Sequence, residues 1–219
     1  MKTIALIHTV KPILNTFSKT LRENCEEEIL IHEIYDDFLA SNPNEIGFFS
    51  KDNKKRLYND IENCCLAKAS IIITTCSTLT PIIEELRPFF NVPIIAIDDE
   101  MGRLAVSKGN RIRVLATAES TIKPTVEKLK KEAKKLNKDI IIESSFDLEA
   151  YEAMKEGNIV FHDNKLLKTI SEIKDFDVIV LAQASMAHLA QLSKNYTSIE
   201  VIGSISSCQE KVLNLIKGL

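Results

Sequence analysis

Residues 70–81 read SIIITTCSTLTP, and residues 177–188 read DVIVLAQASMAH. Each stretch begins with a short, mostly β-branched apolar run, continues into a small polar turn, and ends where a helix can start. An apolar run of this kind is typical of a strand buried on both faces, as in a parallel sheet covered by helices. The two stretches therefore predict two equivalent strand–turn–helix units, with Cys76 in one turn and Gln183 in the other.

The same alternation of short apolar runs and amphipathic segments extends along the 219-residue chain. This pattern predicts an α/β protein with parallel sheets. Residues 36–51 have weak periodicity, one proline, one glycine and several turn formers, and we expect a loop over the site there. Strands are expected near residues 3–8, 29–34, 70–75, 93–97, 111–117, 139–144, 177–182 and 199–203.

An internal repeat relates the two parts of the chain. IALIHTVKP at residues 4–12 resembles VLATAESTIKP at residues 114–124, and PIIAI at residues 93–97 resembles EVIGS at residues 200–204. The alternative explanation is chance similarity between common strand–helix units.

The repeat predicts two pseudo-symmetric α/β halves. The first comprises residues 1–110, with a C-terminal helix at 205–219 packing back on it, and the second comprises residues 111–204. Ligands of open parallel sheets bind beyond the carboxyl ends of the strands, where turns expose backbone N–H groups. We therefore expect the site in the cleft between the halves.

Composition excludes several functional classes. A net charge of −3 gives no electrostatic footprint for nucleic acid or a membrane surface. No apolar run approaches the ~20 residues that cross a bilayer, and the N-terminus has no signal-peptide pattern. The five cysteines are odd in number and include no C-x-x-C pair, which favours reduced thiols. We expect a cytoplasmic protein, with a homodimer as the default assembly.

Sequence motifs for cofactors are absent. The chain contains no G-x-G-x-x-G and no G-x-x-x-x-G-K-[ST], so nicotinamide and P-loop nucleotide binding are not supported. There is no H-E-x-x-H or similar metal-ligand spacing. We expect neither a cofactor nor a metal.

Cys76 is the strongest candidate for chemistry. It follows an apolar strand and precedes hydroxyl residues and Pro81, which suits the first turn of a helix. The positive end of a helix dipole favours the thiolate form that acts as a base or nucleophile. Most free cysteines are small buried apolar residues. A position at a strand end among hydroxyls favours the functional interpretation.

Gln183 has a different role, because an amide neither ionises nor accepts a proton usefully. Together with Ala184 and Ser185 it offers an amide, a hydroxyl and backbone N–H groups that could hold a carboxylate. Equally, Ser185 could cap the following helix while Gln183 satisfies backbone groups.

Two further strand ends carry polar side chains. Thr117 and Thr121 lie in a hydroxyl-rich turn and could bind a carboxylate, although ordinary helix capping would also explain them. His8 and Thr9 close the first strand, and His8 is the histidine best placed to carry a proton.

Together, the duplicated halves and the motifs TTCSTLTP, VLATAEST and VLAQASMAH resemble the aspartate/glutamate racemase superfamily, which includes hydantoin racemases, maleate isomerases and arylmalonate decarboxylases. The resemblance covers essentially the whole chain. It implies a cofactor-independent enzyme whose site lies between two halves. In the family's racemases two cysteines flank the α-carbon, one removing a proton as thiolate and the other returning one to the opposite face.

The first-half motif is close to the family pattern. Cys76-Ser77-Thr78 matches a Cys-Asn-Thr motif except at Ser77. The acidic residue that often follows the first strand is replaced here by His8.

The second half departs further. Thr117 and Thr121 match hydroxyls that help to bind the substrate carboxylate, but Gln183-Ala184-Ser185 differs at every position from the Cys-Thr-His motif that it replaces. A second thiol is therefore missing, and losing a positioned acid–base group costs typically about 10²–10⁴-fold in rate.

Three functions remain compatible with these residues. The protein could be a racemase or isomerase of a small carboxylate or amino-acid derivative, a decarboxylase-like, lyase-like or hydrolytic enzyme using one cysteine, or a small-acid-binding protein without turnover. We favour the first, with Cys76 as the thiolate acid or base. The residues expected to be catalytic are Cys76 and His8, and those expected to bind substrate are Thr9, Ser77, Thr78, Thr117, Thr121, Gln183, Ala184 and Ser185.

Overall fold

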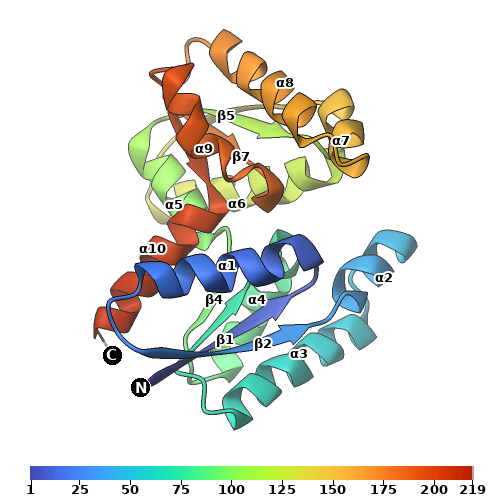
Figure 1. Ribbon diagram of the computed structural model, residues 1–219, viewed down its shortest axis with the longest axis vertical. Helices are drawn as coiled ribbons and strands as arrows, with labels where there is room; N and C mark the ends of the chain where they lie inside the picture. Colours follow the sequence, from blue (N-terminus) through green and yellow to red (C-terminus); the bar gives the residue numbers. More distant parts are fainter. Residues whose placement is uncertain (219) are drawn as a thin grey trace. The chain divides into compact units, whose positions relative to one another are not determined.

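A computed structural model describes residues 1–218, and the chain divides into two compact units (Figure 1). The first unit comprises Met1–Ile97 together with the chain from Cys208 onward, and the second comprises Asp98–Ser207. Among the described residues, no helix is both long enough and apolar enough to span a membrane.

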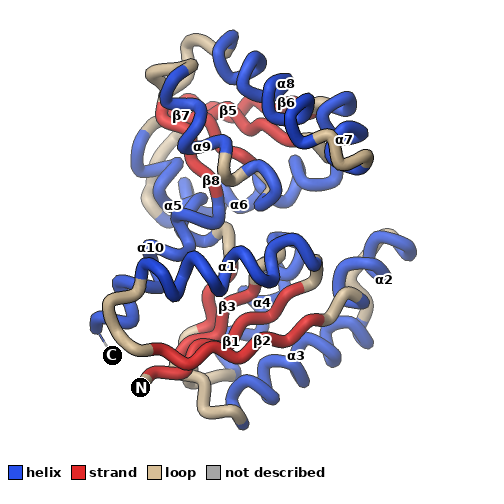
Figure 2. The backbone as a smooth tube through the Cα atoms, in the orientation of Figure 1, coloured by secondary structure: helices blue, strands red, loops and turns tan. Residues whose placement is uncertain are grey.

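The first unit is built on a four-stranded parallel sheet in the order β2-β1-β3-β4. Figure 2 shows its strands between α1 and α3. Its elements are β1 (Lys2–His8), α1 (Lys11–Asn24), β2 (Ile29–Tyr35), α2 (Phe38–Ile46), α3 (Lys51–Leu66), β3 (Ile71–Thr74), the 3₁₀ turn η1 (Ser77–Leu79), α4 (Thr80–Leu86), η2 (Arg87–Phe89) and β4 (Ile94–Ala96).

The second unit has the equivalent sheet order, β6-β5-β7-β8, with all pairs parallel. Its elements are α5 (Asp99–Lys108), β5 (Arg111–Ala116), η3 (Glu119–Thr121), α6 (Ile122–Lys135), β6 (Ile141–Phe146), α7 (Leu148–Lys155), α8 (Ile159–Glu172), β7 (Val178–Leu181), η4 (Ala184–Met186), α9 (Leu189–Leu192), η5 (Ser193–Asn195) and β8 (Glu200–Gly203), with α10 (Ser204–Gly218) continuing into the first unit.

These two sheets confirm the predicted α/β class and the eight predicted strands. The central strands of both sheets are buried along their length, because helices cover both faces. This is why the sequence shows unbroken β-branched runs rather than alternation.

The strand registers place the repeat more exactly than the sequence did. Ile4 pairs with Ile71 in the first sheet, and Ile112 pairs with Val178 in the second. Ile4 therefore corresponds to Ile112, and not to Val114 as the sequence similarity suggested. The helices α1 and α6 follow at a different offset because the 3₁₀ turn η3 lengthens the second connection.

Alternate residues of the second sheet enter two separate cores. Val114 and Val180 pack with residues of α5 and α6, whereas Leu115, Ile179 and Leu181 pack with residues of α7, α8 and α9. In the first unit, Ala5 and Ile7 pack toward α2, α3 and α4. Burial on both faces fixes the register, since a slip of one residue would exchange the two cores.

The sequence predicted that the first half would end near residue 110, after α5. The structure instead divides the chain between Ile97 and Asp98. Helix α5 therefore belongs to the second unit, where it packs extensively on α6. At the other end of the chain, the Gln209 amide on α10 donates to the Phe17 carbonyl oxygen on α1 at 3.0 Å. These contacts are long-range, so the linear repeat alone could not assign the two helices to a unit.

The expectation of a loop over residues 36–51 is wrong. Residues 38–46 form α2, with Pro43 inside it, and Gly47 ends the helix in the left-handed conformation at φ 83°. Leu39 is fully buried in the first unit's core and anchors this short helix. Tertiary packing therefore overrides a local sequence rich in turn formers.

Candidate functional site

The Cys76 turn lies at the carboxyl end of β3. Cys76 has extended backbone (φ −130°, ψ 120°) and is half-buried. Its Sγ lies 2.9 Å from the Thr78 hydroxyl oxygen. A hydroxyl at this distance can donate a hydrogen bond to a thiolate, which stabilises the charged form.

The helix after Cys76 has Pro81 in its first turn, as the sequence predicted, but it begins further from the thiol than expected. The 3₁₀ turn η1 intervenes, and the seven-residue helix α4 begins at Thr80 with Pro81 in its first turn. Cys76 is therefore not at the N-terminus of an α-helix. The Thr78 hydroxyl, rather than a helix dipole, is the group that the structure brings to the thiol.

His8 lies at the end of β1 and is completely buried. Its Nδ1 lies 2.8 Å from the hydroxyl oxygen of Thr75, the residue before Cys76, and its Nε2 lies 3.8 Å from a Glu33 carboxylate oxygen. Burial lowers the pKa of His8 below its ordinary value of 6.5, outweighing the opposite effect of Glu33. Burial therefore favours the neutral imidazole.

Two polar atoms of adjacent residues at this strand end have no hydrogen-bond partner among the described residues. They are His8 Nε2 and the Thr9 hydroxyl oxygen, and both side chains are at least 98% buried. Unsatisfied buried polar atoms are rare in folded proteins and commonly accompany a functional role. The end of β1 thus leaves hydrogen-bonding capacity beside the Cys76 turn, to which Thr75 connects it.

The Gln183 turn in the second unit has the same backbone form as the Cys76 turn, with φ −127° and ψ 141° at Gln183. The Gln183 amide oxygen accepts hydrogen bonds from Thr117 N at 2.6 Å, Ala118 N at 3.2 Å and the Thr117 hydroxyl at 3.1 Å. Of these donors, the Thr117 hydroxyl is one that the sequence analysis expected to bind a carboxylate. In this structure the protein's own amide engages it.

The remaining predicted residues lie at the ends of the same strands. The Thr121 hydroxyl donates to the Ala118 carbonyl oxygen at 2.8 Å and so closes its own turn. Ser77 is half-buried within η1. Ala184 and Ser185 lie within η4, where Ala184 is half-buried and Ser185 is exposed.

A cluster of ionisable side chains in the second unit escaped the sequence analysis. His188 Nε2 lies 2.9 Å from both carboxylate oxygens of Asp163, and His162 Nδ1 lies 2.7 Å from Asp163 Oδ1. The sequence shows His162 and Asp163 as neighbours at the start of α8, but no nearby residue pattern connects them to His188. Residues 1–218 contain no group of three or more His, Cys, Asp or Glu side chains arranged to hold a metal ion.

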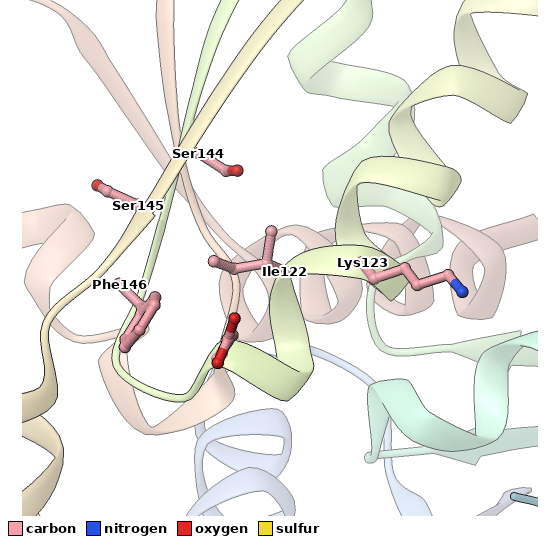
Figure 3. Close-up of a pocket in the computed structure, with 6 residues that line it drawn as sticks. Ile122, Lys123, Ser144, Ser145 and Phe146 are labelled. Carbon is pink, nitrogen blue, oxygen red and sulfur yellow. The ribbon is translucent and has the colours of Figure 1, made fainter.

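A cavity of about 490 Å³ opens beside the Thr117–Thr121 turn. Figure 3 shows Ser144 and Ser145 pointing to opposite sides of β6, and Lys123 pointing away from that strand. The volume of the cavity suits a small molecule. The sequence predicted none of its lining residues, which are Glu119, Ile122, Lys123, Ser144, Ser145 and Phe146.

Comparison with solved structures supports the fold. An aspartate racemase homologue from Pyrococcus horikoshii matches with a TM-score of 0.71 and 17% identity, covering 99% of this chain and 100% of that one. The aspartate racemase of Picrophilus torridus matches with a TM-score of 0.72 and 14% identity over 99% and 95%. The allantoin racemase of Klebsiella pneumoniae matches with a TM-score of 0.70 and 16% identity over 100% and 89%.

No curated protein matches the sequence significantly. A family model described as Asp/Glu/Hydantoin racemase matches residues 46–208, which is most of the chain and includes both the Cys76 and the Gln183 turns. With the duplicated sheets and their strand-end turns, this match shows that the chain belongs to the Asp/Glu/hydantoin racemase family.

Proposed function

We propose that this racemase-family protein is a cofactor-independent enzyme that moves the α-proton of a small carboxylate or amino-acid derivative, with Cys76 as the thiolate acid or base. The observation that supports this most is the Cys76–Thr78 pair, a half-buried thiol with a hydroxyl 2.9 Å away at a strand end. We further propose that it works in the cytoplasm as a homodimer.

In the proposed step, the Cys76 thiolate takes the proton from the α-carbon, and the electron pair of the C–H bond delocalises into the adjacent carboxyl or carbonyl group. Returning a proton to the carbon restores the neutral skeleton, so no oxidant or cofactor is consumed. The Thr78 hydroxyl stabilises the thiolate before transfer and releases it as the S–H bond forms.

The unpartnered Thr9 hydroxyl supports a substrate oxygen bound at the end of β1. Thr9 corresponds to Thr117 in the strand registers, and Cys76 corresponds to Gln183. In the second unit an amide oxygen already engages Thr117 and Ala118. In the first unit the equivalent hydroxyl has no partner among the described residues, so a ligand oxygen could occupy the corresponding place.

His8 serves Cys76 as a positioning residue in this proposal. Its ring is fully buried and holds the hydroxyl of Thr75, the neighbour of Cys76. A neutral buried imidazole in this position fixes the backbone at the thiol, and its Nε2 remains available as a hydrogen-bonding atom. In this proposal His8 does not itself carry the substrate proton, as the sequence had suggested, but supports the residue that does.

A second candidate function follows from Gln183. Since its amide cannot carry a proton and its oxygen is engaged by Thr117, a reaction that needs only one proton carrier fits the chain. Decarboxylation of a malonate is such a reaction, because loss of carbon dioxide generates the carbanion and Cys76 then supplies the single proton.

Proton exchange followed by NMR in D₂O tests the function. The protein is incubated with L-aspartate, L-glutamate, a 5-substituted hydantoin and a substituted malonate, alongside Cys76→Ser and the control Cys25→Ser. Deuterium entering the α-position, slowed about 10²–10⁴-fold in Cys76→Ser and unchanged in Cys25→Ser, supports the proposal.

The products separate the remaining possibilities. Formation of the opposite enantiomer indicates racemisation, and loss of carbon dioxide from the malonate indicates the second candidate. Acids that raise the thermal midpoint without any exchange or decarboxylation would show a binding protein and overturn the enzymatic proposal.

A further inference from the structure

We propose that the cavity of about 490 Å³ beside η3 is a binding site for an α-amino acid with an apolar side chain, held in its zwitterionic form. All six lining residues belong to the second unit. None of them is among the residues proposed to act on the substrate's α-proton. The inference therefore goes beyond the proposed function, and it does not depend on Cys76.

The polar side chains that line the cavity are unused by the protein. None of the four has a side-chain hydrogen bond or an ion pair among the described residues; they are Glu119, Lys123, Ser144 and Ser145. Charged neighbours on the same elements are paired. Lys128, further along α6, bonds to Asp99. On β6, Arg113 donates to Glu143. The lining of the cavity thus keeps donors and acceptors that a ligand can engage.

Two of these side chains carry opposite charges. Glu119 is the first residue of η3, and Lys123 is the second residue of α6. Within one continuous α-helix, a glutamate and a lysine four positions apart are neighbours that commonly pair. Here the 3₁₀ turn interrupts that spacing, and the structure of residues 1–218 shows no ion pair between them. The carboxylate and the ammonium are both free for a ligand that carries both charges.

Helix stability does not account for Lys123. The N-terminus of α6, a helix of 14 residues, carries a partial positive charge that disfavours a lysine in the first turn. Figure 3 shows the Lys123 side chain extended away from β6, and no described residue holds its ammonium there. The four-carbon side chain of a lysine is flexible, so the ammonium can turn toward a carboxylate bound at the rim of the cavity.

Apolar side chains form the rest of the lining. Ile122 packs against the core shared by α5 and α6, and Figure 3 shows its side chain directed toward β6. Phe146, at the carboxyl end of β6, is 43% exposed. Successive strand residues alternate between the two faces, so Ser144 and Phe146 share the face on which Ile142 packs against the same core. A ligand side chain here would remove apolar surface from water.

This combination of groups selects the class of ligand. A simple anion would meet the like charge of Glu119, and a simple cation would meet that of Lys123. A neutral apolar molecule would leave both charges unused. An amino acid matches every group, because its ammonium can bond to Glu119 and its carboxylate to Lys123 and the Ser144 hydroxyl. Its side chain then packs against Ile122 and Phe146.

Isothermal titration calorimetry of the full chain with four probes tests the site. L-leucine carries all three recognised groups, whereas N-acetyl-L-leucine lacks the ammonium, L-leucinamide lacks the carboxylate and glycine lacks the side chain. The variants are Glu119→Gln, Lys123→Gln and Phe146→Ala, whose side chains are all exposed. The controls are Glu127→Gln and Lys130→Gln, which change exposed charges of α6 outside the cavity. Thermal midpoints near that of the wild type verify that each variant is folded.

We expect L-leucine to bind saturably, and each of the other probes to bind about tenfold more weakly. Glu119→Gln should weaken L-leucine about tenfold without weakening N-acetyl-L-leucine, which has no ammonium to lose. Lys123→Gln should weaken L-leucine without weakening L-leucinamide, which has no carboxylate. Phe146→Ala should weaken L-leucine without affecting glycine. Both control variants should bind all four probes as the wild type does.

Three outcomes overturn the inference. The first is the absence of saturable L-leucine binding. The second is L-leucine binding that none of the three cavity variants changes, which places the ligand elsewhere on the protein. The third is a variant that weakens every probe equally, which shows a general change in the surface instead of recognition of one group. The proposed function is tested separately by exchange in D₂O with Cys76→Ser, so either proposal can fail without the other.

Discussion

The amide oxygen of Gln183 lies 2.6 Å from the backbone nitrogen of Thr117 and accepts its hydrogen bond. These residues are 66 positions apart in the chain and join the turns after β7 and β5. In the first unit the corresponding residues are Cys76 and Thr9, and the Thr9 hydroxyl has no partner among the described residues. The two turns thus share their backbone form but differ in their hydrogen bonds.

Replacing Gln183 should destabilise the second unit. Gln183→Ala removes the acceptor of two backbone N–H groups and of a 2%-exposed threonine, and should lower the free energy of unfolding by about 1–3 kcal/mol. Urea denaturation measures this loss. Gln183→Glu keeps an oxygen acceptor and should lie within about 1 kcal/mol of the wild type. Equal stability of the alanine and wild-type proteins would contradict the bonding role.

His8 should make stability depend on pH in a defined direction. Burial lowers its pKa in the folded state, so below pH 6.5 the unfolded chain takes up a proton that the folded protein resists. Stability should therefore fall as the pH decreases from 7.5 to 5.5, and His8→Asn should reduce that slope. Because a single proton is involved, the contribution of His8 changes the free energy of unfolding by at most about 1.4 kcal/mol per pH unit.

Urea denaturation at several pH values checks the His8 prediction, with the exposed His32→Gln as its matched control. The control should keep the wild-type slope. A His8→Asn variant with the same slope as the control would show that His8 takes up its proton equally in both states.

Asp60 should act in the opposite direction. Burial, reinforced by the Asp36 carboxylate, raises the pKa of Asp60 from 3.8 to about 6. The unfolded chain ionises first, so the folded state loses stability as the pH rises from 3.8 to about 6, and the deficit remains above that range. Asp60→Asn should remove it, raising the free energy of unfolding at pH 7.5 on the order of 1 kcal/mol after allowance for partial exposure.

Denaturation at pH 7.5 and pH 4 distinguishes this effect from a general stabilisation. The gain from Asp60→Asn should be clear at pH 7.5 and small at pH 4, and the exposed Asp139→Asn should change neither value. A gain of the same size at both pH values would count against the titration of Asp60.

The strands could be predicted from the sequence, but the helix α2 could not. Apolar runs such as residues 71–74 predict a strand, because both faces of a covered parallel sheet exclude polar side chains. No such local rule identified α2, because its helix depends on Leu39 reaching a core formed by residues far away in the chain. For the same reason the sequence did not show which unit contains α5, because this depends on the packing of α5 on α6.

In the candidate site, the sequence by itself determined the class of fold, the family and the position of Cys76 at a strand end, because these follow from apolar runs and short motifs that are contiguous in the chain. Only the tertiary structure decided that Gln183 engages Thr117, that His8 is buried against Thr75, and that Asp163 joins His162 to His188. Most of these contacts span more than 20 residues, and a hydrogen bond between distant side chains depends on how the strands and helices bring them together. The chemical groups of each turn therefore follow from its own residues, but the fold determines which distant residues form hydrogen bonds with them.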